Sequence, residues 1–161
     1  MTRPSSVVVR RSRIQGRGVY AGRGIAEGDR IIEYTGSRIS NVEADALGDD
    51  ESMTRHHTFL FAVDDDVVID ATRGGNESRY INHSCDPNCE SVVVRGHVYL
   101  HALREIGAGE ELVYDYWYVT DDDYTLEELR RIYPCRCHAA NCRGTLARPP
   151  RRRRKAAGAG Q

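Results

Sequence analysis

The sequence predicts a mostly β domain with a few short helices. Eight short runs rich in β-branched or aromatic residues are typical of strands, at residues 6–10, 18–21, 30–36, 58–63, 67–70, 91–95, 97–103 and 111–116. Turn sequences that contain Gly or Asp, such as AEGD, VRGH and GAGE, stand between many of them. Short strands separated by such turn signals indicate an all-β fold.

Three local motifs place a turn and two helices in this pattern. The run VVVRGHVYL predicts a tight hairpin that turns at residues 95–96. Ser40 and Glu43 form a capping box ahead of VEADAL, and Thr125 and Glu128 form another ahead of LEELRRIY. A Ser or Thr followed three residues later by Glu marks the start of a helix.

Length and apolar content indicate one globular domain. A chain of 161 residues and 18.1 kDa is long enough for a single core. No apolar run approaches the roughly 20 residues needed to cross a bilayer. The first ten residues, MTRPSSVVVR, lack the long apolar region of a signal peptide. We therefore expect neither membrane association nor secretion.

The net charge of −1 hides a strongly basic C-terminal end. The run RRRRK at 151–155 holds five of the 23 basic residues, and none of the 24 acidic residues lies beyond position 150. Residues 1–150 therefore carry a net charge of −6, which favours a cationic peptide over nucleic acid as partner. We expect residues 148–161 to be a disordered basic tail. It would make a weak, non-specific nucleic acid contact, serve as a tether, or be solvated charge only.

The five cysteines indicate a metal site. No secretion signal accompanies them, which argues against a disulfide framework. They are Cys85, Cys89, Cys135, Cys137 and Cys142. The last three, in CRCHAANC, are spaced closely enough to hold one zinc ion, but a closed structural site needs a fourth ligand. His138, Cys85 and Cys89 are the candidates. The alternative is three reduced, buried cysteines without a chemical role.

The central stretch RYINHSCDPNCE, residues 79–90, carries more polar side chains than a turn between strands requires. A metal would account for one of its cysteines, and the proline at position 87 would restrict the backbone of such a loop. Zinc does not explain Asn82 and His83. The pair is therefore a second candidate functional group.

Four motifs, which occur in the family's order, resemble the SET-domain family of protein-lysine methyltransferases. They are GRGVYAGRGIAEGDRIIEYTG, RYINHSCDPNC, GEELVYDYWY and CRCHAANCRGTL. The resemblance covers roughly residues 6–146 and includes a post-SET zinc segment but no pre-SET cysteine cluster. It implies an enzyme that transfers a methyl group from S-adenosylmethionine to the side-chain amine of lysine in a protein.

The resemblance also implies a fold and a division of the chain. The fold would consist of several small curved sheets with short helices, and the C-terminal segment would thread, knot-like, under a loop near NHSC. The implied parts are a SET domain at 6–118, a helical connector at 119–133, a post-SET zinc segment at 134–147 and the basic tail at 148–161.

Two ligand sets follow from the same resemblance. The zinc ligands would be Cys85, Cys135, Cys137 and Cys142. Cys89 is left as a free thiol. The S-adenosylmethionine site would be lined by Gly16, Arg17, Gly18, Arg79, Tyr80, Asn82, His83, Tyr116 and Leu146. Without the family, the glycines of GRG would be plain turn residues, and His83 would be an ordinary hydrogen-bonded side chain.

Tyrosines are the catalytic candidates. By resemblance, Tyr116 positions the amine and the methyl group, Tyr34 lines the lysine channel, and Tyr114 limits the number of methyl groups added. A Tyr at position 114 predicts mono- or dimethylation. The alternative is that tyrosines two apart on a strand form one face of an ordinary core. The same alternation predicts that Trp117 lies opposite Tyr116.

The implied substrate is a lysine-containing protein or peptide, such as a histone tail, or a basic DNA-packaging or ribosomal protein in a bacterial host. The protein would be cytoplasmic, or nuclear and chromatin-bound in a eukaryotic cell. An acidic loop would attract the peptide through Asp45, Asp49, Asp50 and Glu51, unless it is only solvated.

The rival interpretation is a non-catalytic, zinc-stabilised module that binds basic peptides. Such a module would not need Tyr116, Asn82 and His83 together, which favours the enzyme.

Overall fold

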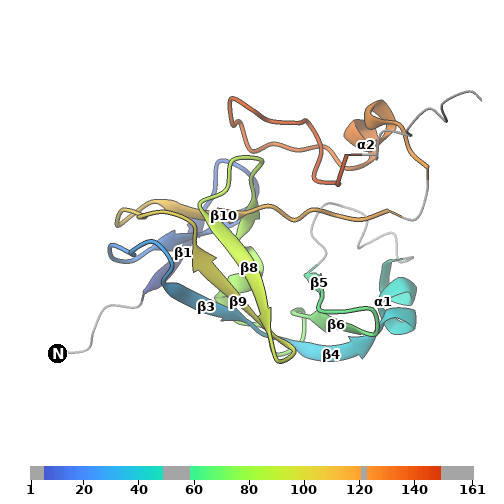
Figure 1. The fold of residues 1–161 in the computed structure, drawn as a ribbon, viewed down its shortest axis with the longest axis horizontal. Helices are drawn as coiled ribbons and strands as arrows, with labels where there is room; N and C mark the ends of the chain where they lie inside the picture. The colour runs from blue at the N-terminus through green and yellow to red at the C-terminus, as the bar shows by residue number, and fades with distance from the viewer. Residues whose placement is uncertain (1–5, 49–58, 121–122, 150–161) are drawn as a thin grey trace, which may run out of the picture.

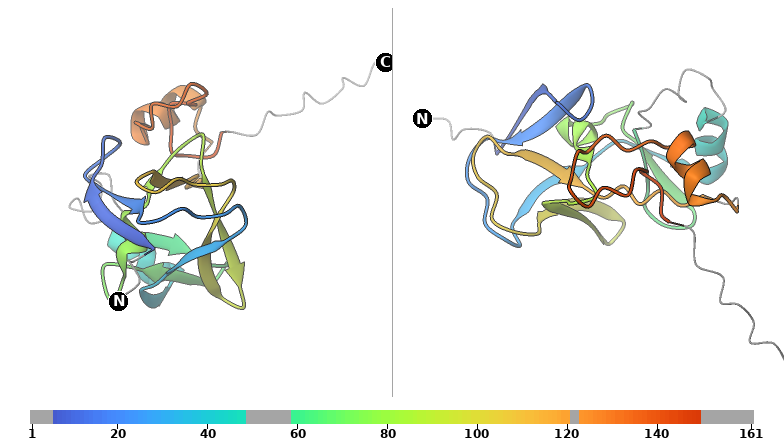
Figure 2. Two further views of the ribbon diagram at one scale, coloured as in Figure 1. Left: turned by 90° about the vertical axis from the view of Figure 1, so that its left-hand side faces the viewer. Right: turned by 90° about the horizontal axis from the view of Figure 1, so that it is seen from above.

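The structure is a computed structural model and describes residues 6–48, 59–120 and 123–149. Two sheets lie side by side, and the C-terminal segment covers one side of both (Figures 1 and 2). The predicted mostly β class, with curved sheets and short helices, is confirmed.

The larger sheet brings together strands from the beginning, middle and end of the chain. Its main path, in spatial order, is β1 (Val7–Arg11), β2 (Arg17–Ala21), β10 (Glu111–Tyr114), β8 (Cys89–Val94), β9 (His97–Ala102) and β3 (Arg30–Tyr34). A seventh, β7 (Asn82–His83), pairs with β10 in parallel. β10 therefore lies beside both the GRG strand β2 and the NHSC loop.

The smaller sheet lies at one end of the larger one, next to the helix α1 (Asn41–Gly48) (Figure 1). Its three antiparallel strands are, in spatial order, β4 (Ser37–Ser40), β6 (Val67–Asp70) and β5 (Leu60–Ala62). A short 3₁₀ helix, η1 (Glu77–Tyr80), follows this sheet and leads directly into β7.

The core lies mainly against the larger sheet, whose strands supply most of its buried side chains, because strand side chains alternate between faces. In β9, Val98, Leu100 and Ala102 are buried and the residues between them are less so. Val19 in β2 and Leu112 in β10, which pair with each other elsewhere in the same sheet, are completely buried.

The C-terminal segment contains α2 (Leu126–Ile132) and the run 133–149. It is attached to the residues that follow β10 by backbone bonds: Tyr118 N–H donates to the Leu146 carbonyl at 3.3 Å, and Arg148 N–H donates to the Tyr118 carbonyl at 2.7 Å. Two of its own apolar residues, Leu129 and Ala147, are buried. The segment therefore buries few apolar side chains for its length.

The local predictions about turns and caps are confirmed. Arg95 (φ 50°) and Gly96 (φ 79°) join β8 to β9, and two consecutive positive φ angles match a type I′ hairpin turn. The Thr125–Glu128 capping box begins α2, with both reciprocal bonds present. At α1 the Glu43 carboxylate accepts from the Ser40 backbone at 2.8 Å.

The predicted strand at 111–116 is too long. β10 ends at Tyr114, and Tyr116 N–H donates to a histidine side chain instead of a neighbouring strand. Trp117 has a φ of 52°, so the strand alternation does not reach it. The alternation from which Trp117 was placed opposite Tyr116 therefore does not apply; the Trp117 ring, 45% exposed, contacts Arg143 and Arg148, whereas Tyr116 packs on Tyr114 and Tyr118. Strands β4 and β7 were not predicted, because neither SRIS nor the two residues Asn82–His83 form an apolar run.

Some predictions fall outside the described residues. They concern the start of the 58–63 run, the acidic positions 49–51 and the basic run 151–155. Within the part of the chain that the structure describes, no helix is both long and apolar enough to span a bilayer.

Candidate functional site

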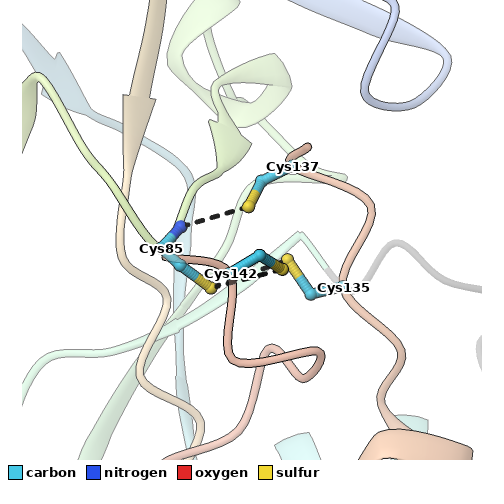
Figure 3. Close-up of side chains that lie close together, drawn as sticks. All are labelled: Cys85, Cys135, Cys137 and Cys142. Atoms are coloured by element: carbon cyan, nitrogen blue, oxygen red, sulfur yellow. Dashed lines mark hydrogen bonds between the residues drawn. The ribbon is translucent and has the colours of Figure 1, made fainter. Parts of the chain in front are cut away.

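Four cysteine side chains converge where the C-terminal segment meets the NHSC loop (Figure 3). The Sγ atoms of Cys85, Cys135, Cys137 and Cys142 all lie within 4.8 Å of one another. Cys85 Sγ is 3.8 Å from Cys135 Sγ and 4.0 Å from Cys142 Sγ. All four are free thiols, without disulfide bonds.

This donor set fits a tetrahedral zinc ion. Zn–S bonds of about 2.3 Å place the sulfurs of a tetrahedron about 3.8 Å apart. Backbone amides also point at the sulfurs: Cys85 N–H donates to Cys137 Sγ at 3.5 Å, and Gly144 N–H donates to Cys142 Sγ at 3.4 Å. Burial raises the pKa of Cys137, but hydrogen bonds from the backbone of Cys85 and Ala139 and from the cysteines Cys135 and Cys142 outweigh it and lower that pKa to about 7.

The structure brings together the four cysteines that the resemblance implied. Cys89 lies apart in β8, where its thiol donates to Asn88 Oδ1 at 3.3 Å, and burial raises its pKa to about 12. His138 is exposed and is not part of the group. Cys85, rather than either of these, completes the set.

His83 lies between the cysteine group and Tyr116, with 2% of its surface exposed. Its Nδ1 accepts from Tyr116 N–H at 3.0 Å, and its Nε2 is 3.4 Å from Cys85 Sγ. Burial, together with the charge of Arg143, lowers the pKa of His83 to about 4, against an opposing effect of Asp115. The ring is therefore neutral, and because Nδ1 is an acceptor, its proton is on Nε2 and faces the sulfur.

Asn82 fastens the GRG turn to the strand β10. Its Nδ2 donates to the carbonyls of Gln15 (3.2 Å) and Arg17 (2.9 Å) and to Glu111 Oε1 (3.1 Å). Gly16, in the same turn, has a φ of 46°, a conformation that favours glycine. The predicted pair of GRG and Asn82 is thus joined by direct bonds.

Glu111 was not singled out from the sequence. Its Oε1 also accepts from Ser12 Oγ at 2.6 Å, and its Oε2 accepts from the Tyr20 hydroxyl at 3.1 Å. A Cβ on Gly18 would lie 2.2 Å from Glu111 Oε1. The absence of a side chain at Gly18 therefore leaves the space that this carboxylate occupies. Sequence alone carries no signal for it, because its partners Asn82, Tyr20 and Ser12 lie 29, 91 and 99 positions away.

Replacing Gly18 with Ala is expected to destabilise the fold by about 1–3 kcal/mol, because the new methyl group displaces the Glu111 carboxylate from its three donors. Chemical denaturation measures the difference. Gly24→Ala is the control, since a Cβ there meets nothing within 4 Å. Equal stability of the two variants would contradict the proposed crowding.

Cations and aromatic rings gather beside Asn82. The Arg17 guanidinium lies 5.3 Å from the Tyr80 ring centre, and the Arg79 guanidinium lies 4.8 Å from it. Arg79 Nε is buried without a hydrogen-bond partner within the described residues. A ligand with a carboxylate and a flat heterocycle would use such cations and ring faces, so these residues fit S-adenosylmethionine. The described contacts do not join Leu146 to this group: its backbone is bonded to Tyr118 and Tyr133.

An aromatic chain links the predicted catalytic tyrosines. Ring centres are 5.2 Å apart for Tyr34 and Phe61, 6.3 Å for Phe61 and Tyr114, and 4.9 Å for Tyr114 and Tyr116. The chain continues through Tyr118 to Tyr133. Phe61 and Tyr133 were not predicted, because each looked like an ordinary apolar residue of a strand or helix.

The phenols of this chain are neutral. Burial is the main cause that raises the pKa of Tyr34, Tyr114 and Tyr116 above the usual value. The Tyr116 hydroxyl donates to the Ile81 carbonyl at 2.8 Å, which fixes its direction and leaves its oxygen free to accept. The result is a buried aromatic wall with one oriented hydroxyl group, that of Tyr116, an arrangement that disfavours water and offers an oxygen to a hydrogen-bond donor such as an amine.

Comparison with known proteins agrees with this geometry. The family model described as SET domain matches residues 16–117. The chain is 40% identical over 144 residues to "Histone-lysine N-methyltransferase trithorax" of Drosophila virilis, a match that covers 87% of the chain and 4% of the relative. It is 40% identical over 149 residues to "Histone-lysine N-methyltransferase 2B" of Homo sapiens (90% of the chain, 5% of the relative).

A third relative is the "Histone-lysine N-methyltransferase, H3 lysine-4 specific" of Saccharomyces cerevisiae, 40% identical over 151 residues (89% of the chain, 13% of the relative). The chain thus spans a small part of the length of these relatives. Since the family model matches more than half of the chain and its motifs meet around one site, the chain belongs to the SET domain family.

Proposed function

We propose that the protein transfers a methyl group from S-adenosylmethionine to the side-chain amine of a lysine in a basic protein, such as a histone tail. The observation that carries the proposal is the contact between the Asn82–His83 strand and the aromatic chain, made by Tyr116 N–H on His83 Nδ1. The S-adenosylmethionine site and the lysine channel would then meet at Tyr116. The three relatives described above are named histone-lysine N-methyltransferases, which supports the same reaction.

The lysine must react as a neutral amine. With a reference pKa near 10.4, removing its proton at pH 7 costs about 4–5 kcal/mol. Burial among aromatic rings disfavours the ammonium form and lowers that cost. S-adenosylmethionine, when bound, supplies a methyl group on a positively charged sulfur. The Tyr116 oxygen, whose proton is held by the Ile81 carbonyl, accepts from the amine and aims its lone pair.

We propose that Cys85, Cys135, Cys137 and Cys142 hold a zinc ion with a structural role. Four thiolates leave no open position on the metal, which is typical of structural sites. The metal would fix the C-terminal segment against the NHSC loop. His83 Nε2–H would then support the Cys85 thiolate from outside the first coordination shell.

Tyr114 is expected to limit the product to mono- or dimethyl-lysine. Its buried phenol lies 4.9 Å from Tyr116 between ring centres, and its hydroxyl would hold a water molecule in the space that a further methyl group needs. Tyr114→Phe removes the hydroxyl without removing the ring, so we expect a higher methylation state. Mass spectrometry of a peptide product measures it. Efficient trimethylation by the unaltered protein would contradict this role.

A direct assay tests the proposed function. The protein, zinc and labelled S-adenosylmethionine are incubated with core histones, and a labelled band that is lost with Tyr116→Phe supports the proposal. Calorimetry with S-adenosylmethionine separates the enzyme from a peptide-binding module. If folded, zinc-loaded protein shows no heat of binding with S-adenosylmethionine, the peptide-binding module is favoured and the proposal is overturned.

If the host is a eukaryote, a histone substrate would place the protein in the nucleus. The net charge of −6 over residues 1–150 suits a basic peptide partner.

A further inference from the structure

One charged pair joins the predicted catalytic strand to the C-terminal segment. Arg143 Nη1 donates to Asp115 Oδ2 at 2.6 Å, and Arg143 Nη2 donates to Asp115 Oδ1 at 2.7 Å. The pair is largely buried, with 16% of the Arg143 side chain and 25% of the Asp115 side chain exposed. Such a two-point arginine–carboxylate contact fixes orientation as well as distance.

The same guanidinium also organises the backbone that follows it. Arg143 Nε donates to the Ala147 carbonyl at 3.1 Å, and Arg143 Nη2 donates to the Leu146 carbonyl at 3.2 Å. The guanidinium lies 5.1 Å from the Trp117 ring centre. Trp117 N–H in turn donates to Asp115 Oδ1 at 3.0 Å. Residues 115–117 and 143–147 are therefore held in one bonded group.

The cysteine group uses a different part of Arg143. The backbone N–H of Arg143 hydrogen-bonds the Cys85 sulfur, and the guanidinium charge, which Arg143→Lys would keep, acts on the same thiol; both lower its pKa, against the larger effect of burial. Its side chain points to Asp115 instead. A change of the side chain therefore leaves the amide at the cysteines in place. The two attachments of the C-terminal segment can be separated by mutation.

We infer that Asp115 and Arg143 form a positioning pair, which aligns residues 143–148 along Tyr118 and holds the Asp115 carboxylate 3.5 Å from the Nδ1 atom of His83, a residue of the predicted S-adenosylmethionine site. The inference rests on the proposed function and adds two residues to it. Neither touches the reacting atoms. Tyr116 is held by Ile81 and by the same His83 atom, so Asp115 lies beside both the predicted cofactor site and the backbone of Tyr116.

The test uses the full-length, zinc-loaded protein with Asp115→Asn, Arg143→Lys and the double variant. Asp115→Asn keeps an oxygen for Trp117 N–H, and Arg143→Lys keeps the charge but loses the two-point contact. Each single change is expected to raise the KM for S-adenosylmethionine about tenfold, and Arg143→Lys, which leaves the Asp115 carboxylate beside His83, should keep kcat within about twofold. The KM of the double variant should be no higher than that of the single variants, because the effects of changing both partners of one contact do not add.

Hydrogen exchange gives a readout that does not depend on activity. The amide of Arg148, which donates to the Tyr118 carbonyl, should exchange faster in all three variants while the zinc content stays at the unaltered level. Arg104→Gln, which breaks an exposed ion pair with Glu110, is the control and should change neither value.

Each outcome decides the inference. An unchanged KM and unchanged Arg148 exchange, additive effects in the double variant, or zinc loss from Arg143→Lys would overturn it. If the unaltered protein transfers no methyl group, the proposed function fails, whereas the exchange data still test the alignment. If the unaltered protein is active and the variants match it, the positioning pair alone fails.

Discussion

Tyr116→Phe is expected to lower kcat by about a hundredfold or more, with cofactor binding little changed. The Tyr116 hydroxyl lies where the S-adenosylmethionine site and the lysine channel would meet. Its hydrogen bond to the Ile81 carbonyl, at 2.8 Å, fixes its orientation. Phe keeps the ring contacts with Tyr114 and His83 but has no oxygen to aim the amine. Single-turnover kinetics and calorimetry measure the two quantities separately.

The control for this variant is Tyr99→Phe, which removes a hydroxyl from a tyrosine in β9 whose ring contacts Arg30. Loss of the bond from Tyr116 to Ile81 should cost only about 1 kcal/mol of stability, so both variants should remain folded. A Tyr116→Phe protein that turns over at the unaltered rate would remove Tyr116 from the mechanism.

Removal of the metal is expected to abolish methyl transfer and to expose the C-terminal segment to proteases. Zinc bound by four cysteines can contribute on the order of 10 kcal/mol to the folded state. Few buried apolar side chains hold this segment otherwise, Leu129 and Ala147 among them. Chelation or Cys135→Ser should therefore release residues 133–149. Zinc content, limited proteolysis and activity measure the effect.

Cys89→Ala is the matched control, because this cysteine is buried in β8 away from the four sulfurs. It should keep one zinc per chain and an intact C-terminal segment. Full activity and unchanged protease resistance in metal-free protein would show that the cysteines do not hold the segment in place.

Local features of this fold could be predicted from the sequence because each depends on neighbouring residues. The hairpin at Arg95–Gly96 needs two positive φ angles, and the capping box at Thr125 needs a glutamate three positions later. The cysteine spacing indicated a metal in the same way. The choice of Cys85 over Cys89 and His138 came only from the family resemblance.

The rest depends on which distant segments meet. Glu111 occupies the space beside Gly18 because β10 pairs with β2, and Arg143 reaches Asp115 because the C-terminal run returns to Tyr118. Phe61 joins the aromatic chain through the second sheet. No periodicity within a strand reports such pairings, so these residues could not be recognised beforehand.

The position of β10 has a consequence for the order in which the molecule forms. Its partners in the sheet, β2, β7 and β8, all precede it in the chain, and Leu112 pairs with Val19 across more than ninety positions. Contacts that close such long loops slow folding. During synthesis, β2, β7 and β8 therefore leave the ribosome before β10 is available to pair with them. Until β10 emerges, their unpaired edges are exposed to aggregation.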